Sequence, residues 1–215
     1  MSLLSLATSR RSWPLGLVLA CLCGGPAAAS VEDARAAFAR GDLAGVVEAL
    51  EPAAEAGDAQ AQFELALMHL NGMAVAKDAR VAATWLRQAS ELGHADAQFL
   101  YGSMIYRGDG VPQDHREALF WFRRAAMAGH AEAQLNLGLM HERGDGTRPD
   151  DVRAHMWLNL AASRFSEAQS RERTLAIRGR DRIAQRLTPI QLEIAHRLAS
   201  DWLGRSASRS FSTQP

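Results

Sequence analysis

The sequence predicts an all-α fold, a solenoid of antiparallel helix pairs with a helical cap at each end. Three observations support this prediction. Similar blocks recur every 36 residues through the middle of the chain, tryptophans and alanines recur with the same period, and glycines punctuate each block at fixed places. A block of this length holds two helices and the turns that connect them.

The composition limits the class of protein. The chain has 215 residues, of which 47% are hydrophobic and 22% are charged, so it can bury a core. Its formal net charge is zero, which argues against a general nucleic-acid binder.

Residues 1–29 have the layout of a signal peptide. Arg10 and Arg11 precede an apolar run over 13–23, and Ala27-Ala28-Ala29 fits the A-x-A rule for cleavage before Ser30. The run is too short for a stable membrane span, which needs about 20 residues. Cleavage there would remove Cys21 and Cys23, so the exported chain would form no disulfide. Export without disulfides favours the periplasm of a Gram-negative cell.

Alternatives stay open for this segment. The stretch VLAC (18–21) resembles a weak lipobox, which would make Cys21 a lipidated N-terminus and the protein a membrane-anchored scaffold. The stretch SRRSW (9–13) resembles a twin-arginine signal, and a buried N-terminal helix or a secreted product are further options. No later run is apolar enough for a transmembrane segment.

Residues 31–56 are predicted to form an N-terminal cap of two short alanine-rich helices, separated at Gly41-Asp42. Three repeats follow over 57–164. Their first helices (A helices) are expected at 59–70, 95–106 and 131–142, and their second helices (B helices) at 79–92, 115–128 and 151–164.

Glycine and aspartate mark the helix ends within each repeat. The A helices end at Gly72, Gly108 and Gly144, since glycine adopts the left-handed C-cap conformation at little steric cost. The predicted N-caps of the B helices are Asp78, Asp114 and Asp150.

The sequence RGDG occurs twice, at 107–110 and 143–146, where an A helix turns into a B helix. Its first glycine is predicted to cap the helix, and its Arg and Asp to be merely compatible with the turn. An adhesion signal is an alternative. A cation site lacks oxygen ligands, and a phosphate loop lacks the Lys-Ser/Thr pair.

These blocks resemble a known family. The pattern A-x-A-Q, then G-x-G, then A-x-x-W-x-x-x-A-A-x-x-G over 57–164 is similar to the Sel1-like repeat, a relative of the tetratricopeptide repeat. The resemblance implies a right-handed solenoid with an adaptor or regulatory role. Some similar proteins are described as penicillin-binding or hydrolytic, so a cell-envelope enzyme is the second hypothesis. Ala74 and Phe165 depart from the pattern where it has glycine.

Residues 165–203 are predicted to form a C-terminal cap. An Arg-rich helix is expected at 166–187, weakened at Gly179, and a second helix at 188–203 with Thr188 as N-cap and Pro189 as its first residue. The Ser/Arg-rich tail 204–215 is predicted to be disordered.

The A helices carry the predicted partner-binding residues. Positions that recur between repeats serve shared packing, whereas positions that change are free to contact a partner. The changing positions form one stripe on the concave face of the solenoid, hereafter the A-helix stripe. Its residues are Glu64, Leu67, Asn71, Asp96, Leu100, Ser103, Arg107, Glu132, Asn136, Leu139 and Arg143. An ordinary solvated face is the alternative.

Other candidate sites are weaker. Trp85, Trp121 and Trp157 share one repeat position, which predicts a packing role. The histidines, including His141 and His155 of one hairpin, lack metal-ligand spacing. No catalytic motif is present, so no catalytic, cofactor-binding or metal-binding residue is predicted and the protein is not expected to be an enzyme.

Charge is distributed unevenly along the predicted mature chain. Residues 31–163 hold 19 acidic and 12 basic residues, whereas 164–215 hold 5 acidic and 10 basic. The basic C-terminal part is therefore an alternative docking surface for an anionic partner.

Overall fold

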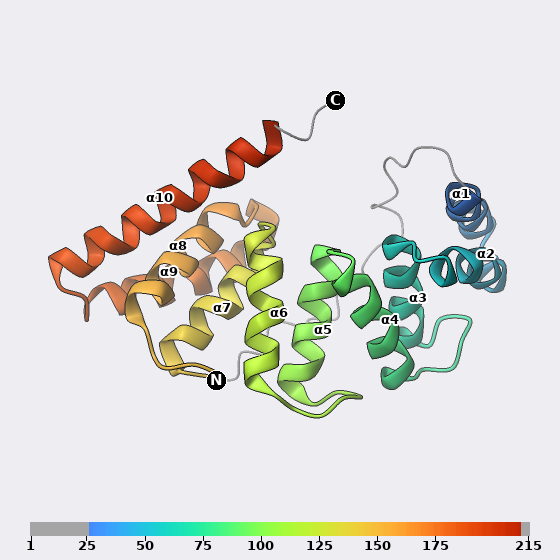
Figure 1. The fold of residues 1–215 in the computed structure, drawn as a ribbon, viewed down its shortest axis with the longest axis horizontal. Coiled ribbons are helices and arrows are strands. Elements are labelled where there is room, and N and C mark those ends of the chain that lie inside the picture. Colours follow the sequence, from blue (N-terminus) through green and yellow to red (C-terminus); the bar gives the residue numbers. More distant parts are fainter. Residues whose placement is uncertain (1–25, 212–215) are drawn as a thin grey trace. The chain divides into compact units, whose positions relative to one another are not determined.

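Residues 26–211 are described by a computed structural model, in which they form ten α-helices and one short 3-10 turn (Figure 1). The predicted signal peptide up to residue 25, with the lipobox and the arginine pair, lies outside the described residues. The all-α solenoid of helix pairs predicted from the sequence is confirmed. The chain divides into two compact units, one ending at Asp114 and the other beginning at His115.

The first unit contains the predicted N-terminal helices, the first repeat and the A helix of the second repeat. Consecutive helices pack against each other throughout this unit. They are α1 (Pro26–Ala39), α2 (Leu43–Glu55), α3 (Ala59–Asn71), α4 (Ala79–Glu91) and α5 (Ala95–Arg107).

The second unit contains the remaining repeat helices and the C-terminal segment. In it α7 packs against α6 and α8, while α9 and α10 both pack against α8. Its elements are α6 (His115–Met127), α7 (Ala131–Arg143), α8 (Asp151–Arg164), the 3-10 turn η2 (Glu167–Gln169), α9 (Ser170–Ala184) and α10 (Pro189–Phe211).

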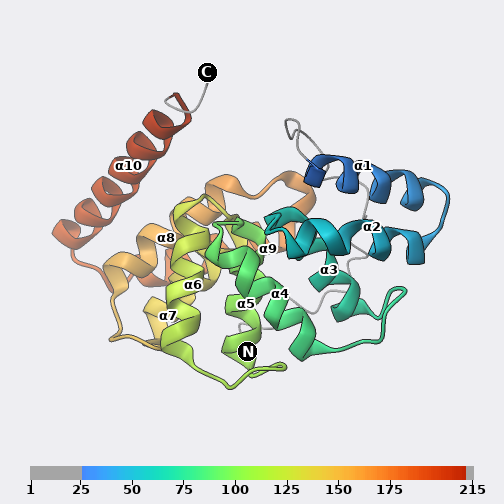
Figure 2. The same ribbon diagram turned by 45° about the vertical axis from the view of Figure 1, so that its right-hand side comes forward.

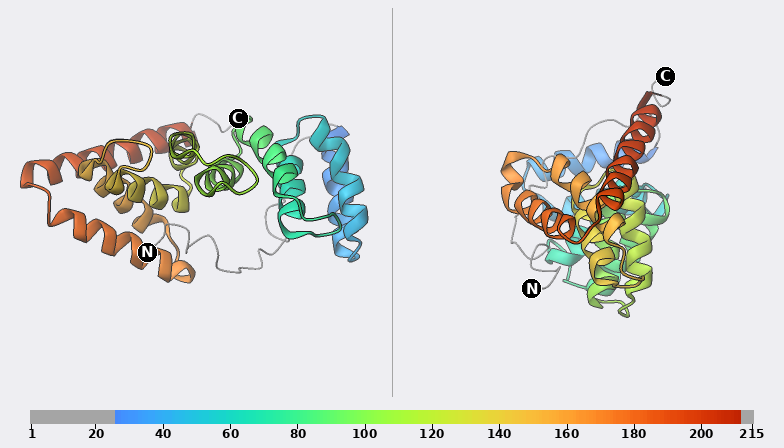
Figure 3. Two further views of the ribbon diagram at one scale, coloured as in Figure 1. Left: turned by 90° about the horizontal axis from the view of Figure 1, so that it is seen from below. Right: turned by 90° about the vertical axis from the view of Figure 1, so that its left-hand side faces the viewer.

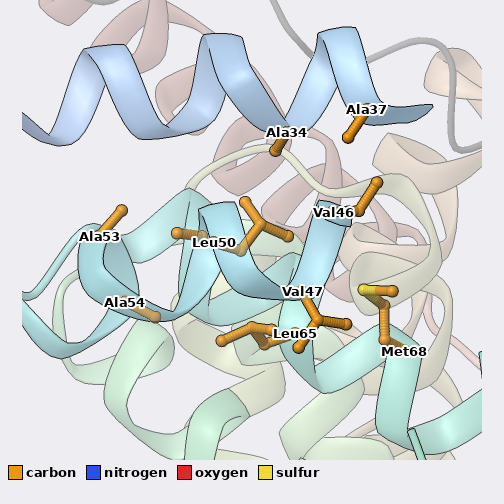
Figure 4. Packing of buried hydrophobic residues seen from close by; sticks show 10 residues of the cluster. Ala34, Ala37, Val46, Val47, Leu50, Ala53, Ala54, Leu65 and Met68 are labelled. Carbon is orange, nitrogen blue, oxygen red and sulfur yellow. The ribbon is translucent and has the colours of Figure 1, made fainter. Parts of the chain in front are cut away.

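Small residues let α1 cover the start of the repeats. Ala34 and Ala37 of α1 face Val46 and Leu50 of α2, and the cluster continues to Leu65 on α3 (Figure 4). All five side chains are buried. Alanine permits close approach of helices, and the branched residues fill the space that remains.

A glutamine inside each A helix fixes that helix to the preceding one. The side-chain amides of Gln62, Gln98 and Gln134 donate to the carbonyls of Ala54, Ser90 and Ala126 at 2.9, 3.0 and 3.1 Å. All three glutamines are buried. This glutamine is the last residue of the A-x-A-Q motif, and the motif alone does not reveal its role.

The A helices also share an N-cap whose chemistry varies. Asp58 accepts a hydrogen bond from the Ala61 amide at 2.7 Å, and His94 and His130 do the same for Ala97 and Ala133 through Nδ1 at 3.2 Å. The histidines therefore hold Nδ1 without a proton, and their recurrence at this turn is explained by capping.

Both glycines of RGDG have a structural role. Gly108 and Gly144 are left-handed C-caps, as predicted, with φ of 77° and 80°. The second glycine is also required by the structure, because Gly110 (φ 74°) lies against the start of α4, where an added Cβ would stand 2.7 Å from the Ala79 carbonyl oxygen. Arg107 and Asp109 form an ion pair with each other. The turn therefore uses all four residues.

The C-terminal helices differ from the prediction in three ways. The expected helix over 166–187 is split into η2 and α9, which ends at Ala184. Gly179 is not a weak point, because it is buried where an added Cβ would lie 3.1 Å from Leu158. Helix α10 continues to Phe211, so residues 204–211 are helical rather than disordered. The predicted N-cap is confirmed, since the backbone N–H of Gln191 donates to the Thr188 hydroxyl at 3.3 Å.

Helices α9 and α10 diverge from the loop that joins them (Figure 3). Trp202 anchors α10 on α8, as an edge-to-face partner of Trp157 at 6.3 Å, with the Arg164 guanidinium 4.8 Å from its ring. Trp121 and Trp157 are buried, as predicted. Trp85 is only partly buried, but it packs against the core cluster of the first unit, in keeping with the predicted packing role.

A buried histidine lies at the contact between α8 and α10. The His155 side chain is 2% exposed, its ring lies 5.3 Å from that of His196, and its Nδ1 has no hydrogen-bond partner. Burial lowers the pKa of His155 to about 4, and the nearby charges of His196 and Arg180 act in the same direction while Asp181 opposes them.

We expect Gly110→Ala to destabilise the chain by roughly 2–3 kcal/mol, because it combines left-handed strain with overlap on the Ala79 carbonyl. Asp109→Ala is the control, since it breaks a surface ion pair worth less than about 1 kcal/mol. Thermal melts of the two variants decide the matter. Equal melting temperatures would show that the second glycine is dispensable.

Acid should weaken the α8–α10 contact through His155. Since its folded pKa is lowered, the unfolded chain takes up the proton more readily, and the stability present above pH 6.5 is lost as the pH falls toward about 4. His155→Leu should remove this loss. Leucine is chosen because Leu119 occupies the equivalent position in the preceding repeat, 36 residues earlier. The difference in unfolding free energy between the two proteins should change by up to about 3 kcal/mol across this range in denaturant titrations. Parallel pH profiles would contradict the assignment.

Candidate functional site

The A-helix stripe of the first unit is carried by α3 and α5, which lie on either side of α4 (Figure 2). Their amino-terminal halves contact each other. His94 Nε2 donates to Gln60 Oε1 at 3.0 Å, and its ring stacks on Phe63 with a centroid distance of 4.5 Å. The amino-terminal ends of the two helices are therefore close to each other.

The amino-terminal end of this stripe is acidic. Glu64 on α3 is half-buried and accepts a hydrogen bond from the Gln60 amide at 2.8 Å. Burial raises the pKa of Glu64, the negative charge of Asp96 on α5 raises it further, and the bond from Gln60 opposes both effects. Two carboxylates thus share one end of the stripe at an energetic cost to the free protein.

Two leucines occupy the middle of the stripe. Leu67 follows Glu64 by three residues on α3, and Leu100 follows Asp96 by four on α5. Both side chains are half-buried, unlike their neighbours Met68 and Tyr101, which belong to the core. The leucines therefore present apolar surface without being needed to fill the interior.

The carboxyl-terminal end of the stripe is polar. The Asn71 amide donates to the Leu67 carbonyl at 2.8 Å, which leaves its side chain folded back on its own helix. Arg107 is half-buried and paired with Asp109. The first unit thus presents an acidic end, an apolar middle and a basic residue at the far end.

One predicted stripe residue does not belong to this surface. Ser103 is 2% exposed, and its hydroxyl donates to the Phe99 carbonyl of the preceding turn at 2.8 Å. A small residue that satisfies its own hydroxyl can lie against the neighbouring helices, which is why position 103 tolerates serine in the interior. The prediction that Ser103 contacts a partner is therefore wrong.

The second unit carries its own copy of the stripe on α7. Glu132 accepts a hydrogen bond from Gln169 of η2 at 2.8 Å, so the C-terminal segment already contacts this end. Asn136 and Leu139 are half-buried, and Arg143 is exposed. This copy has one carboxylate where the first unit has two.

Two arginines, one in the last turn of α9 and one just beyond it, serve the packing of the second unit. Arg182 binds Glu142 with two hydrogen bonds of 3.0 and 2.7 Å, and Arg186 binds Asp151 in the same way at 3.0 and 2.8 Å. Burial opposes the charge of Glu142, but Arg182 and Arg186 outweigh it and lower its pKa.

These groups line an open depression of about 600 Å³ together with Arg143 and Pro149. Arg182 and Arg186 form ion pairs within the second unit. The basic C-terminal segment therefore has two fewer positive charges available to bind an anionic partner.

Two further features bear on chemistry. Among the described residues, no three His, Cys, Asp or Glu side chains come together as metal ligands, and the His155 ring lies against that of His196. None of the helices described here has the length and apolar character needed to cross a membrane.

The stacked helix pairs, each with a capped A helix that ends at a left-handed glycine, define a protein of the helical-repeat class. Comparison with protein families matches the Sel1 repeat at residues 59–94, 95–130 and 131–164. The chain thus contains three Sel1 repeats, and the Sel1-repeat fold is one that provides interaction scaffolds.

Solved structures support the fold. A protective antigen of uropathogenic Escherichia coli, c5321, is 24% identical, with a TM-score of 0.66 over 86% of this chain and 44% of its own. A Sel1 repeat protein from Oxalobacter formigenes is 27% identical, with a TM-score of 0.57 over 66% of this chain and 55% of its own. The chain thus spans about half the length of these proteins. No curated protein matches it in sequence.

We expect Glu64→Gln to stabilise the free protein slightly, by less than about 1 kcal/mol at neutral pH. The raised pKa means that folding disfavours the charged form of the Glu64 carboxylate. The contribution of Glu64 to the free energy of unfolding is therefore most favourable below pH 4.5, the ordinary pKa, and declines as the pH rises above that value. The amide keeps the volume and removes the charge. A melting temperature that falls at pH 7 and not at pH 4 would contradict this.

Proposed function

We propose that the chain is an exported interaction module that binds a partner protein or peptide on the α3–α5 part of the A-helix stripe. The repeat scaffold supports this proposal, because helical repeats stack helices into extended surfaces that bind other chains. The residues involved are Glu64, Leu67, Asn71, Asp96, Leu100 and Arg107.

The observation that carries the proposal is the pair of carboxylates beside half-exposed leucines. Placing a second carboxylate, that of Asp96, near Glu64 carries an electrostatic cost, since burial raises the pKa of Glu64 and the charge of Asp96 raises it further. A local arrangement that costs stability is commonly kept for binding. A partner that brings a basic side chain to the carboxylates and an apolar side chain to Leu67 and Leu100 would offset the cost.

The periplasm is the proposed location. The support is the order of features at the N-terminus, in which Arg10 and Arg11 precede an apolar run and Ala27–Ala29 offer a cleavage site. Intact mass of the exported protein distinguishes the alternatives. A chain beginning at Ser30 agrees with the proposal, and a lipidated Cys21 would make the protein a membrane-anchored scaffold instead.

Site-specific photo-crosslinking in the native cell tests the binding surface. A photoreactive residue at Leu100 should give a discrete adduct with the partner, and one at Thr84, on the exposed face of α4, serves as the matched control. Adducts from position 84 and none from position 100 would place the partner elsewhere.

Leu100→Asp should weaken partner binding by roughly thirtyfold, the loss expected when an apolar contact worth about 2 kcal/mol is removed. The melting temperature should barely change, because the side chain is half-buried and lies outside the packing face. The measurement is the yield of the adduct from a crosslinker at Leu67. Undiminished yield with an intact fold would remove Leu100 from the site.

A further inference from the structure

The outer face of α6 is unlike that of an ordinary solvated helix. Phe120 is 53% exposed and Met127 is 37% exposed, and they lie two turns apart. Arg116, Arg123 and Arg124 are exposed on the same side of the helix, opposite the buried Ala118, Phe122 and Ala125. The face therefore combines large apolar side chains with positive charge.

The aromatic part of this face is held in place. The Phe120 ring makes an edge contact with Trp121, with centroids 5.0 Å apart and an interplanar angle of 80°. The Arg124 guanidinium lies 5.8 Å from the Phe120 centroid and 5.4 Å from that of Trp121. The Trp121 indole in turn donates to Glu117 at 3.4 Å. A ring fixed in this way loses little conformational entropy when it is covered.

The chain contains its own comparison for this face. Helix α4 occupies the same place in the preceding repeat, 36 residues earlier, and there Thr84, Gln88 and Glu91 stand where α6 has Phe120, Arg124 and Met127. The Thr84 hydroxyl bonds to the Arg80 carbonyl of its own helix at 3.1 Å. A B helix of this scaffold therefore needs neither aromatic nor methionine at these positions.

We propose that this face of α6 is a second docking surface, which binds an acidic amphipathic helix of a partner protein. Two apolar residues of that helix, about 10.5 Å apart, would cover Phe120 and Met127. Carboxylates beside them would pair with Arg123 and Arg124. Aromatic residues, Met and Arg are the types enriched at the centre of protein interfaces, and the arginines select for an acidic partner. The surface does not depend on the A-helix stripe.

Binding of designed peptides to the full exported chain tests this surface. The probes are labelled helical peptides of about five turns, with Leu or Phe at i, i+3 and i+7 and Glu or Asp elsewhere, and counterparts with Lys and Arg in place of the acids. In fluorescence anisotropy the acidic peptides should bind and the basic ones should not. Failure of every acidic peptide to bind would overturn the proposal.

The decisive variant gives α6 the residues of α4. Phe120→Thr, Arg124→Gln and Met127→Glu together should weaken acidic-peptide binding at least tenfold, with little change in melting temperature because α4 folds with these residues. Ala substitutions at Thr84, Gln88 and Glu91 are the matched control and should leave binding unchanged. A triple variant that is folded and binds as well as the native chain would contradict the proposal.

Flotation with vesicles containing phosphatidylglycerol distinguishes the other anionic partner. Binding of the native chain to vesicles and not to peptides, lost in the triple variant, would reassign this face of α6 to a membrane surface and overturn the peptide proposal.

Discussion

The direction in which each A helix presents its side chains depends on one buried hydrogen bond. In all three repeats a glutamine amide reaches the carbonyl of the residue eight positions earlier, at the end of the preceding helix. Each of these carbonyls also accepts a hydrogen bond from a backbone amide, that of Gly57, Gly93 or Gly129. The glutamine therefore adds a second bond, with a net contribution of about 0.5–1.5 kcal/mol, which links the two helices and favours one crossing angle over its neighbours. Asparagine has the same amide group on a side chain that is one methylene shorter, so its amide would not reach this carbonyl. This explains why glutamine recurs at the position.

The two ends of each A helix complete this constraint. Asp58, His94 and His130 satisfy the free amides at its start, and left-handed Gly72, Gly108 and Gly144 end it at the same point in each repeat. With both ends and the crossing angle set by recurring residues, the remaining positions change at little cost to the fold. Glu64, Leu67 and Leu100 occupy such positions, and so do Phe120 and Met127 on a B helix.

Much of the fold could be predicted because the chain repeats itself. The 36-residue period located six helices, and the glycine C-caps and the Asp78 and Asp150 N-caps follow from local chemistry. The C-terminal helices were predicted less well, since no second copy existed for comparison. Nothing local in 166–187 distinguishes one helix from a 3-10 turn followed by a helix, and the burial of Gly179 depends on Leu158 from a different helix.

The candidate site was only partly predictable for a related reason. Comparison of repeats identifies positions that change, but a changing position is not always an exposed one. Ser103 lies at the border of the packing face and is buried, whereas Leu100, three residues earlier, remains half-exposed. The proximity of Glu64 and Asp96 could not be predicted, because it depends on how closely α3 and α5 approach through His94, Gln60 and Phe63.

Hydrogen exchange of a Gln98→Ala variant tests most directly whether the buried glutamine sets the position of the A helix. In the native chain the amides at the junction of α4 and α5 should exchange slowly, since the Gln98 amide holds the Ser90 carbonyl at 3.0 Å. The variant should exchange roughly fivefold to tenfold faster at Leu92–Ala97, in keeping with a local loss of about 1–1.4 kcal/mol for one hydrogen bond, while α1 and α2 stay protected. Unchanged protection at this junction would show that packing alone positions the helix and would contradict the account.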